Sequence, residues 1–207
     1  MRSLLKTLLL LTVLSSFPAS VQAQIAKETP AVRQVVAAKL MDNYSGESFN
    51  SQGLISRAEL ASIMVRTFGL DKYKVANQVN VMAVQDVKPS HPAFQDIQTV
   101  LKTGVMEGYR DNMFFPNQKV TRAEALAIFA QAYGVFQFPK SYVNELLAPY
   151  SDNRSIPNWA RKAVATLVAE RFISTDERGN ISPQQPMTRG DLALLLSKYL
   201  QRNNINQ

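Results

Sequence analysis

Cysteine is absent from this 207-residue chain, and histidine occurs once, at His91. The missing cysteines exclude a disulfide scaffold, a thiolate zinc site and a cysteine nucleophile, and a single histidine excludes a cluster of histidine ligands. Charged residues are sparse at 19%, whereas hydrophobic residues make up 46%. This composition is typical of a folded globular protein and excludes a chain that is disordered throughout. We therefore expect a folded protein without a metal centre, cofactor or catalytic residues.

No apolar run in the chain approaches the roughly 20 residues that a membrane-spanning helix needs. The apolar run Leu8–Leu14 follows Arg2 and Lys6 and precedes Val21-Gln22-Ala23, which places small residues where a signal peptidase reads. This order predicts a secretory signal peptide at residues 1–23. The mature chain is then exported to the periplasm, cell wall or cell surface of a bacterium, with no transmembrane segment. The absence of cysteine also excludes a lipid anchor on an N-terminal cysteine.

Basic residues outnumber acidic ones, 23 against 16, which gives a formal net charge of +7 at pH 7. A surplus of positive charge favours anionic partners. Nucleic acid is not expected as the partner of an exported chain, so the candidates are acidic polysaccharide, wall polymer or lipid head groups. The alternative is a basic surface that is merely solvated.

The chain contains three copies of one unit. A four-residue motif recurs as Ser56-Arg57-Ala58-Glu59, Thr121-Arg122-Ala123-Glu124 and Thr188-Arg189-Gly190-Asp191. At the same offsets other positions match, among them Leu40/Val105/Phe172, Ile63/Ile128/Leu195 and Pro116/Pro183. We predict repeats at 24–70, 84–136 and 148–202, linkers at 71–83 and 137–147, and a tail at 203–207.

Each repeat has the pattern of a helix, a loop and a second helix. Apolar residues at helical spacing mark the first helices: Val32, Val35, Val36 and Leu40; Ile97, Val100 and Leu101; Ala163, Val164, Leu167 and Val168. The second helices begin at the four-residue motif, and Lys140–Leu147 is a candidate for an additional short helix. Two amphipathic helices cannot bury both apolar stripes alone, but three such pairs can. The sequence therefore predicts an all-α fold, with three helix-loop-helix repeats packed as a pseudo-threefold bundle.

The recurring motif is typical of a capping box, in which the hydroxyl and the acidic side chain satisfy amides at a helix start. Capping does not require the arginine that follows the hydroxyl residue in all three copies, and a positive charge there opposes the helix dipole. One interpretation is that the guanidinium and free helix amides together hold an anion. The alternative is an ion pair between repeats, made with Asp86 or Asp152.

The second repeat resembles a surface-layer homology repeat. The resemblance rests on Val84-Gln85-Asp86, on the segment Gly104–Asn117, and on Thr121-Arg122-Ala123-Glu124. The third repeat is similar to the same family through Tyr150-Ser151-Asp152, Trp159-Ala160, Pro183 and Thr188-Arg189. The resemblance covers nearly all of the chain after the signal peptide. It implies a three-pronged helical module that binds acidic, often pyruvylated, wall polysaccharide in grooves between repeats.

The resemblance also implies site residues. The best-equipped groove would combine Arg122 and Thr121 with Asp152 and Trp159. A weaker groove would combine Arg57 and Ser56 with Asp86, and the turn at Gly108 and Tyr109 would contribute backbone. A third corner, at Arg189, is expected to be mostly structural. The implied function is that of a noncatalytic anchor, tether or coat component, whose partner is an acidic or peptidoglycan-linked polymer or another envelope protein.

The sequence also leaves three other functions to consider: a calcium-binding module, an exported hydrolase and a protein–protein adaptor. Asn50–Leu60 is similar to the second half of an EF-hand loop, which would make the chain a calcium-binding module. Glu59 is the only carboxylate in that segment, and the glycine of this loop is missing from the other repeats. An exported hydrolase would need a positioned acid and base, and no two carboxylates pair by motif. A protein–protein adaptor of the envelope is the remaining alternative.

Overall fold

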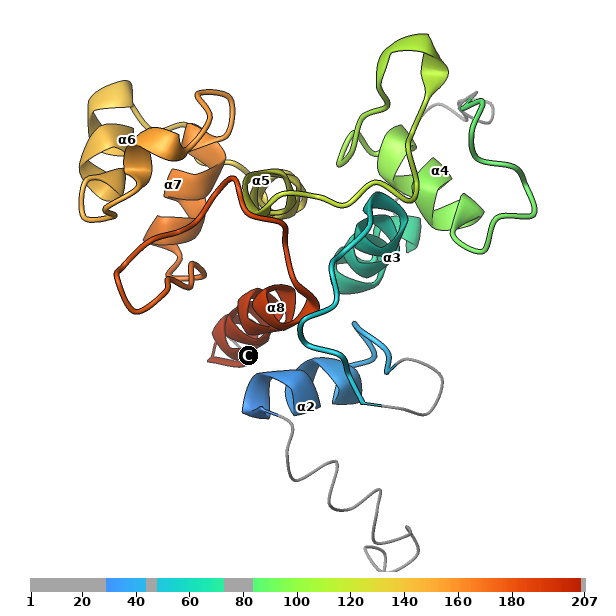
Figure 1. Ribbon diagram of the computed structural model, residues 1–207, viewed down its shortest axis with the longest axis horizontal. Helices are drawn as coiled ribbons and strands as arrows, with labels where there is room; N and C mark the ends of the chain where they lie inside the picture. The colour runs from blue at the N-terminus through green and yellow to red at the C-terminus, as the bar shows by residue number, and fades with distance from the viewer. Residues whose placement is uncertain (1–28, 44–47, 73–83, 206–207) are drawn as a thin grey trace, which may run out of the picture.

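A computed structural model describes residues 29–43, 48–72 and 84–205 of the chain (Figure 1). These residues form α-helices and short 3₁₀ turns with no strand, which confirms the predicted all-α class. The helices are α2 (Pro30–Ala37), α3 (Arg57–Phe68), α4 (Phe94–Lys102), α5 (Arg122–Tyr133), α6 (Lys140–Leu147), α7 (Arg161–Ala169) and α8 (Arg189–Ile205). The predicted signal peptide at 1–23 lies outside the described residues.

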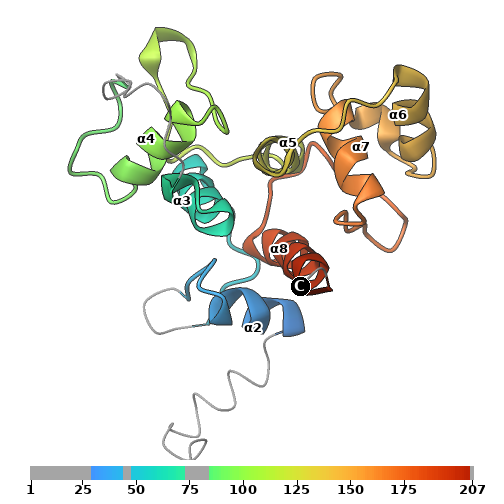
Figure 2. The same cartoon turned by 180° about the vertical axis from the view of Figure 1, so that it is seen from behind.

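The first helix of each repeat packs on the second helix of another repeat. The pairs are α4 on α3, α7 on α5, and α2 on α8, so the last repeat closes on the first. Figures 1 and 2 show three prongs that diverge from a centre formed by α3, α5 and α8, and α6 is an extra layer on α7. The fold is thus the predicted pseudo-threefold arrangement. Each helix buries its single apolar stripe against a neighbour, because no repeat has enough apolar surface to close alone.

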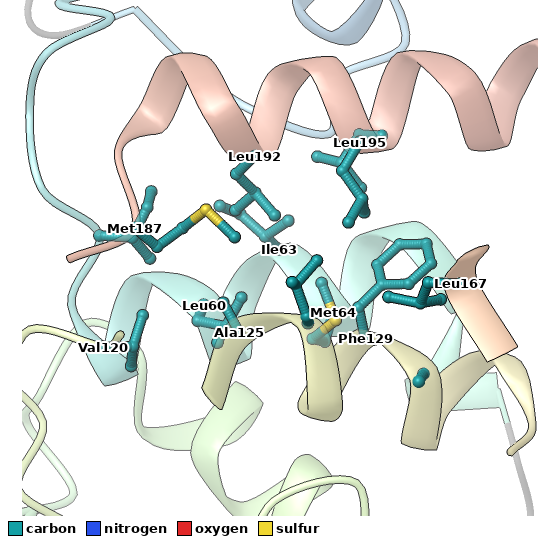
Figure 3. Close-up of a cluster of buried hydrophobic side chains, with 14 of the residues drawn as sticks. Leu60, Ile63, Met64, Val120, Ala125, Phe129, Leu167, Met187, Leu192 and Leu195 are labelled. Atoms are coloured by element: carbon teal, nitrogen blue, oxygen red, sulfur yellow. The ribbon is translucent and has the colours of Figure 1, made fainter. Parts of the chain in front are cut away.

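The hydrophobic core lies where the three second helices meet. Figure 3 shows side chains from α3, α5 and α8 pointing toward one another, with Phe129 among them. The labelled residues of this cluster, which include Leu60, Ile63, Met64, Leu192 and Leu195, are at most 3% exposed. A core shared by three repeats means that each repeat is stabilised by the other two.

The threefold relation extends to the backbone. Each first helix is followed by a residue in the left-handed region, at Lys39 (φ 57°), Gly104 (φ 70°) and Arg171 (φ 61°). A left-handed residue commonly terminates a helix and turns the chain away from its axis. The loop that follows then carries the chain across to the next second helix.

A closed ring of backbone hydrogen bonds joins the three segments before the second helices. The amide of Ile55 donates to the carbonyl of Met187 at 3.0 Å, Val120 to Ile55 at 3.1 Å, and Met187 to Val120 at 2.9 Å. Each repeat therefore donates to one neighbour and accepts from the other. This ring sets the three helix starts, and the motif on each, close to the pseudo-threefold axis.

Candidate functional site

The hydroxyl residues of the repeated motif cap their helices as predicted. Ser56 Oγ accepts from the Glu59 amide at 3.2 Å, and Thr188 Oγ1 accepts from the Asp191 amide at 3.1 Å. In the second repeat the capping box is reciprocal, because Glu124 Oε2 also accepts from the Thr121 amide at 2.7 Å. Ser56 and Thr121 therefore have a structural role that capping explains.

The next two amides of each second helix, which the anion interpretation assumed to be free, are already bound. In α3, the Arg57 amide donates to Gln118 O and the Ala58 amide to Pro116 O, both at 2.9 Å. The equivalent donors and acceptors are Arg122 to Gln185, Ala123 to Pro183, Arg189 to Gly53 and Gly190 to Ser51. Loop carbonyls from another repeat take the place that an anion would occupy, so the expectation of an anion on these amides is wrong.

The three motif arginines form an interlock between repeats. Each guanidinium Nε donates to a carbonyl in the loop of the next repeat: Arg57 to Phe114 at 2.7 Å, Arg122 to Ile181 at 2.7 Å, and Arg189 to Phe49 at 3.0 Å. An Nη2 atom of each arginine donates to a second carbonyl of the same loop: Arg57 to Glu107, Arg122 to Ser174 and Arg189 to Asp42. The three arginines are only 5%, 9% and 3% exposed, so the interlock is buried.

The three arginines differ in their carboxylate partners. Arg122 Nη1 lies 3.1 Å from Asp191 Oδ1, and Arg189 Nη1 binds Glu59 Oε1. Within the described residues, Arg57 has no carboxylate at ion-pair distance, and the equivalent acid, Glu124, accepts hydrogen bonds from Thr121 instead. These acids belong to the next repeat's motif, so the expected ion pairs with Asp86 and Asp152 do not form.

Two aromatic rings take the place of a carboxylate at Arg57. Its guanidinium carbon lies 4.7 Å from the ring centre of Tyr109 and 4.6 Å from that of Phe114. Burial lowers the pKa of Arg57 from its ordinary value, and the nearby Tyr109 and Glu124 partly oppose this effect. The arginine remains charged at neutral pH, since a guanidinium is not deprotonated in proteins. Arg57 is therefore a buried cation that a ligand carboxylate could still approach.

The two predicted aspartates clamp loops of their own repeats. Asp86 accepts from the amides of Phe114 and Phe115 at 2.8 and 2.6 Å. Asp152 accepts from the amides of Ile181 and Ser182 at 2.9 and 2.7 Å. In each case the clamped loop carries the carbonyl that binds a motif arginine, so the aspartate positions that acceptor.

Replacing Asp152 with alanine is therefore expected to destabilise the protein, by about 2–3 kcal/mol, because hydrogen bonds to a charged acceptor are among the stronger ones. Chemical denaturation followed by circular dichroism measures this loss. Glu177→Ala, an exposed acid in the same repeat, is the matched control. A loss for Asp152→Ala no larger than the control would contradict the clamp.

Three grooves lie beside the motif arginines, one at each junction between repeats. We name them by their arginine. The Arg57 groove is the largest of them, at about 690 Å³, against about 310 Å³ for the Arg189 groove and 370 Å³ for the Arg122 groove. The Arg57 groove runs along α5 from Glu124 to Gln131, about 10 Å at the rise of an α-helix.

The walls of the Arg57 groove come from two prongs. Gly108 and Tyr109 line one wall, and Trp159 and Lys162 line the other. The indole of Trp159 is 63% exposed, so the chain's single tryptophan lies outside the core. Tyr109 is 43% exposed. An apolar ring surface, the cationic groups of Arg57 and Lys162, the acidic residues Glu107 and Glu124, and backbone polar groups therefore line one solvent-accessible space.

Trp159 and Arg122 are not brought into one groove, contrary to the combination predicted from the sequence. Trp159 precedes α7, whose start lies beside the C-terminal end of α5, where Lys162 Nζ donates to Gln137 Oε1 at 3.2 Å. Arg122 begins α5, one helix length away. The Arg122 groove instead contains Asp176 and Asp191, and Asp152 is not among its lining residues.

Sequence reasoning missed Lys162. Its signal was a basic residue three positions after the tryptophan, and the structure places both residues in the lining of one groove. The structure gives no support to a calcium site at Asn50–Leu60, because the Glu59 carboxylate, the only one in that segment, binds Arg189. Nowhere in the described part of the chain do three or more His, Cys, Asp or Glu side chains gather as metal ligands would.

A known protein family matches the chain at three places, one in each predicted repeat. The family model for the S-layer homology domain matches residues 23–61, 85–126 and 149–193. Of the helices in the described segments, none is long and apolar enough to cross a bilayer.

Similar proteins are known from several bacteria. A cellulosome-anchoring protein of Acetivibrio thermocellus is 27% identical over 172 residues, 82% of this chain and 37% of the relative. A surface-layer 125 kDa protein of Lysinibacillus sphaericus is 28% identical over 179 residues, 85% of this chain and 14% of the relative. An endoglucanase of Bacillus sp. is 23% identical over 195 residues, 90% of this chain and 19% of the enzyme. The chain thus spans well under half the length of these relatives.

Proposed function

The chain belongs to the S-layer homology family, and on that basis we propose that it is an exported, noncatalytic module that anchors itself, and any partner it carries, to the bacterial cell envelope. Two relatives are described as a cellulosome-anchoring protein and a surface-layer protein, names that refer to anchoring and to the surface layer. The endoglucanase aligns over only 19% of its own length, so glucan hydrolysis is not transferred to this chain.

We infer that the ligand is an anionic wall polysaccharide and that it binds in the Arg57 groove. The observation that carries this proposal is the guanidinium of Arg57, which donates to two backbone carbonyls and has no carboxylate at ion-pair distance among the described residues. Lys162 adds a second positive charge in the groove. An acidic group on the polymer would complement these charges, and a guanidinium fork suits a carboxylate such as a pyruvate ketal.

The aromatic walls complete the site. A sugar ring has an apolar face of C–H groups, and the exposed indole of Trp159 offers a flat apolar surface with a polar N–H at its edge. Tyr109 stands on the opposite wall beside Gly108. Ligand grooves commonly combine an apolar lining with a few placed polar groups, and the Arg57 groove has this composition.

The other two grooves are proposed to be closed by the chain itself. In the Arg189 groove, Glu59 binds Arg189, and two further lining residues, Asp42 and Arg66, pair at 2.6 Å. In the Arg122 groove, Asp191 pairs with Arg122. In both grooves a carboxylate of the chain already pairs with the motif arginine, so an anionic ligand would have to displace it. We therefore expect one polysaccharide site per chain, formed by Arg57, Gly108, Tyr109, Trp159 and Lys162.

Replacing Trp159 with alanine is expected to weaken binding to purified sacculi of the source organism by about tenfold, because Trp159 is a large aromatic residue of the groove and is more exposed than Tyr109. Cosedimentation of the protein with sacculi measures the bound fraction. The indole is 63% exposed, so the variant should unfold at nearly the same temperature as the wild type.

Tyr142→Ala is the matched control, since Tyr142 is an aromatic residue of α6 that is 42% exposed and lines none of the three grooves. Lys162→Gln tests the charge, and its loss of binding should shrink as salt is added. Equal sedimentation of wild type, Trp159→Ala and Lys162→Gln would refute the Arg57 groove as the site. A wild type that stays in the supernatant would refute binding to the wall and direct attention to a protein partner.

A further inference from the structure

An aromatic pair extends the Arg57 groove onto the neighbouring loop of the second repeat. Tyr109 lines the groove, and its ring contacts that of Phe115 edge to face, with centroids 5.3 Å apart. Phe115 itself is 40% exposed and lies beyond the groove lining. The two rings therefore form a continuous exposed aromatic surface that begins inside the groove and ends outside it.

Phe115 occupies a position that disfavours a bulky residue. Its φ angle is +56°, in the left-handed region, where side chains other than those of glycine, asparagine and aspartate are uncommon. The loop imposes this conformation, because Asp86 holds the Phe115 amide and the Phe115 carbonyl accepts from Gln118. A strained residue that persists at an exposed position points to a role in function.

The equivalent positions in the other repeats carry small polar residues. Asn50 has φ 50° and Ser182 has φ 56°, so all three loops share the conformation. Ser182 also shares the hydrogen bond, since its amide donates to Asp152 as that of Phe115 does to Asp86. The fold therefore does not require an aromatic residue here, and among these three positions phenylalanine occurs only beside the groove whose arginine has no carboxylate at ion-pair distance within the described residues.

We propose that Tyr109 and Phe115 form a stacking platform for a second sugar unit of the polymer whose acidic unit binds beside Arg57. This inference rests on the proposed function of the Arg57 groove and extends it along the chain of the ligand. The platform is apolar and the groove is charged, which matches a polymer in which an acidic residue is followed by a neutral pyranose. The Arg57 guanidinium, packed over Tyr109, fixes one end of the platform.

The test replaces Phe115 with asparagine, the residue at the equivalent position of the first repeat. The probes are wall polysaccharide fragments released from the sacculi by hydrofluoric acid and separated into single repeating units and longer chains. Titration calorimetry with the full chain should give roughly three- to tenfold weaker binding of the longer fragments, the range of one aromatic contact. Binding of the single unit should be unchanged, and the variant should unfold at the same or a higher temperature, because asparagine tolerates the left-handed conformation.

Each other outcome has a distinct meaning. Unchanged binding of the longer fragments by Phe115→Asn, with Trp159→Ala still weakened, would overturn the platform and leave the proposed function standing. An equal loss for both fragment lengths would also overturn it, because Phe115 would then act on the groove alone. If the wild type binds neither fragment, the proposed function itself fails. Tyr142→Ala should match the wild type in every measurement.

Discussion

Replacing Arg189 with alanine is expected to lower the free energy of unfolding by about 3–5 kcal/mol, the cost of removing one partner from a buried ion pair. Arg189 is 3% exposed and joins the last repeat to the first. Its Nε donates to Phe49 O at 3.0 Å, and its Nη atoms bind the Glu59 carboxylate and the Asp42 carbonyl. Alanine would leave these acceptors without a donor, and would also remove the guanidinium packed on the Phe49 ring at 4.6 Å. Urea denaturation followed by circular dichroism measures the loss.

Arg202→Ala supplies the control. Arg202 is on the same helix and pairs with Glu170 at 3.4 Å, but its side chain is 53% exposed. The Glu170 side chain is 11% exposed, but the arginine of this pair is more than half exposed, so we expect Arg202→Ala to cost less than Arg189→Ala. Arg189→Lys separates charge from geometry, because lysine retains the charge and lacks the planar fork that reaches several acceptors at once. If Arg189→Ala were no more destabilising than Arg202→Ala, the interlock would not hold the ends of the chain together.

The fold could be predicted from the sequence because its determinants are local and repeated. Apolar spacing identifies the helices, and the Ser/Thr-x-x-Glu/Asp pattern identifies where α3, α5 and α8 begin. The need to bury one stripe per helix then requires packing between repeats. The pairing of α2 with α8 follows from the same need, since the first and last repeats would otherwise leave one helix face exposed.

The site could be predicted only in part, because each motif functions across a boundary between repeats. The sequence identifies Arg57, Tyr109 and Trp159 as unusual but does not say which loop each arginine reaches. Spacing also cannot distinguish Glu124, which folds back on its own helix, from Glu59, which reaches Arg189. The two carboxylates differ in the partner that each side chain reaches, and this difference depends on contacts between repeats that spacing does not reveal.

The second large effect is expected at Phe129, where alanine should also cost about 3–5 kcal/mol, the usual range for a fully buried phenylalanine. Its side chain is 0% exposed and lies in the shared core (Figure 3). The ring contacts Phe68 of α3 at 5.2 Å, Tyr199 of α8 at 5.6 Å and Phe172, which follows α7, at 6.1 Å. One ring of α5 therefore bridges all three repeats, and its loss leaves a cavity that no single helix can fill.

Phe129→Leu isolates the cavity from the aromatic contacts, because leucine fills much of the volume without offering a ring edge. We expect its loss to be less than half that of Phe129→Ala, measured by the same urea denaturation. Because Phe129 and Arg189 hold the three repeats together at different places, both alanine variants should still unfold in one transition, with circular dichroism and tyrosine fluorescence coincident. Separate transitions in Phe129→Ala would mean that a repeat is stable without its neighbours, and the shared core would then be a contact between independent units.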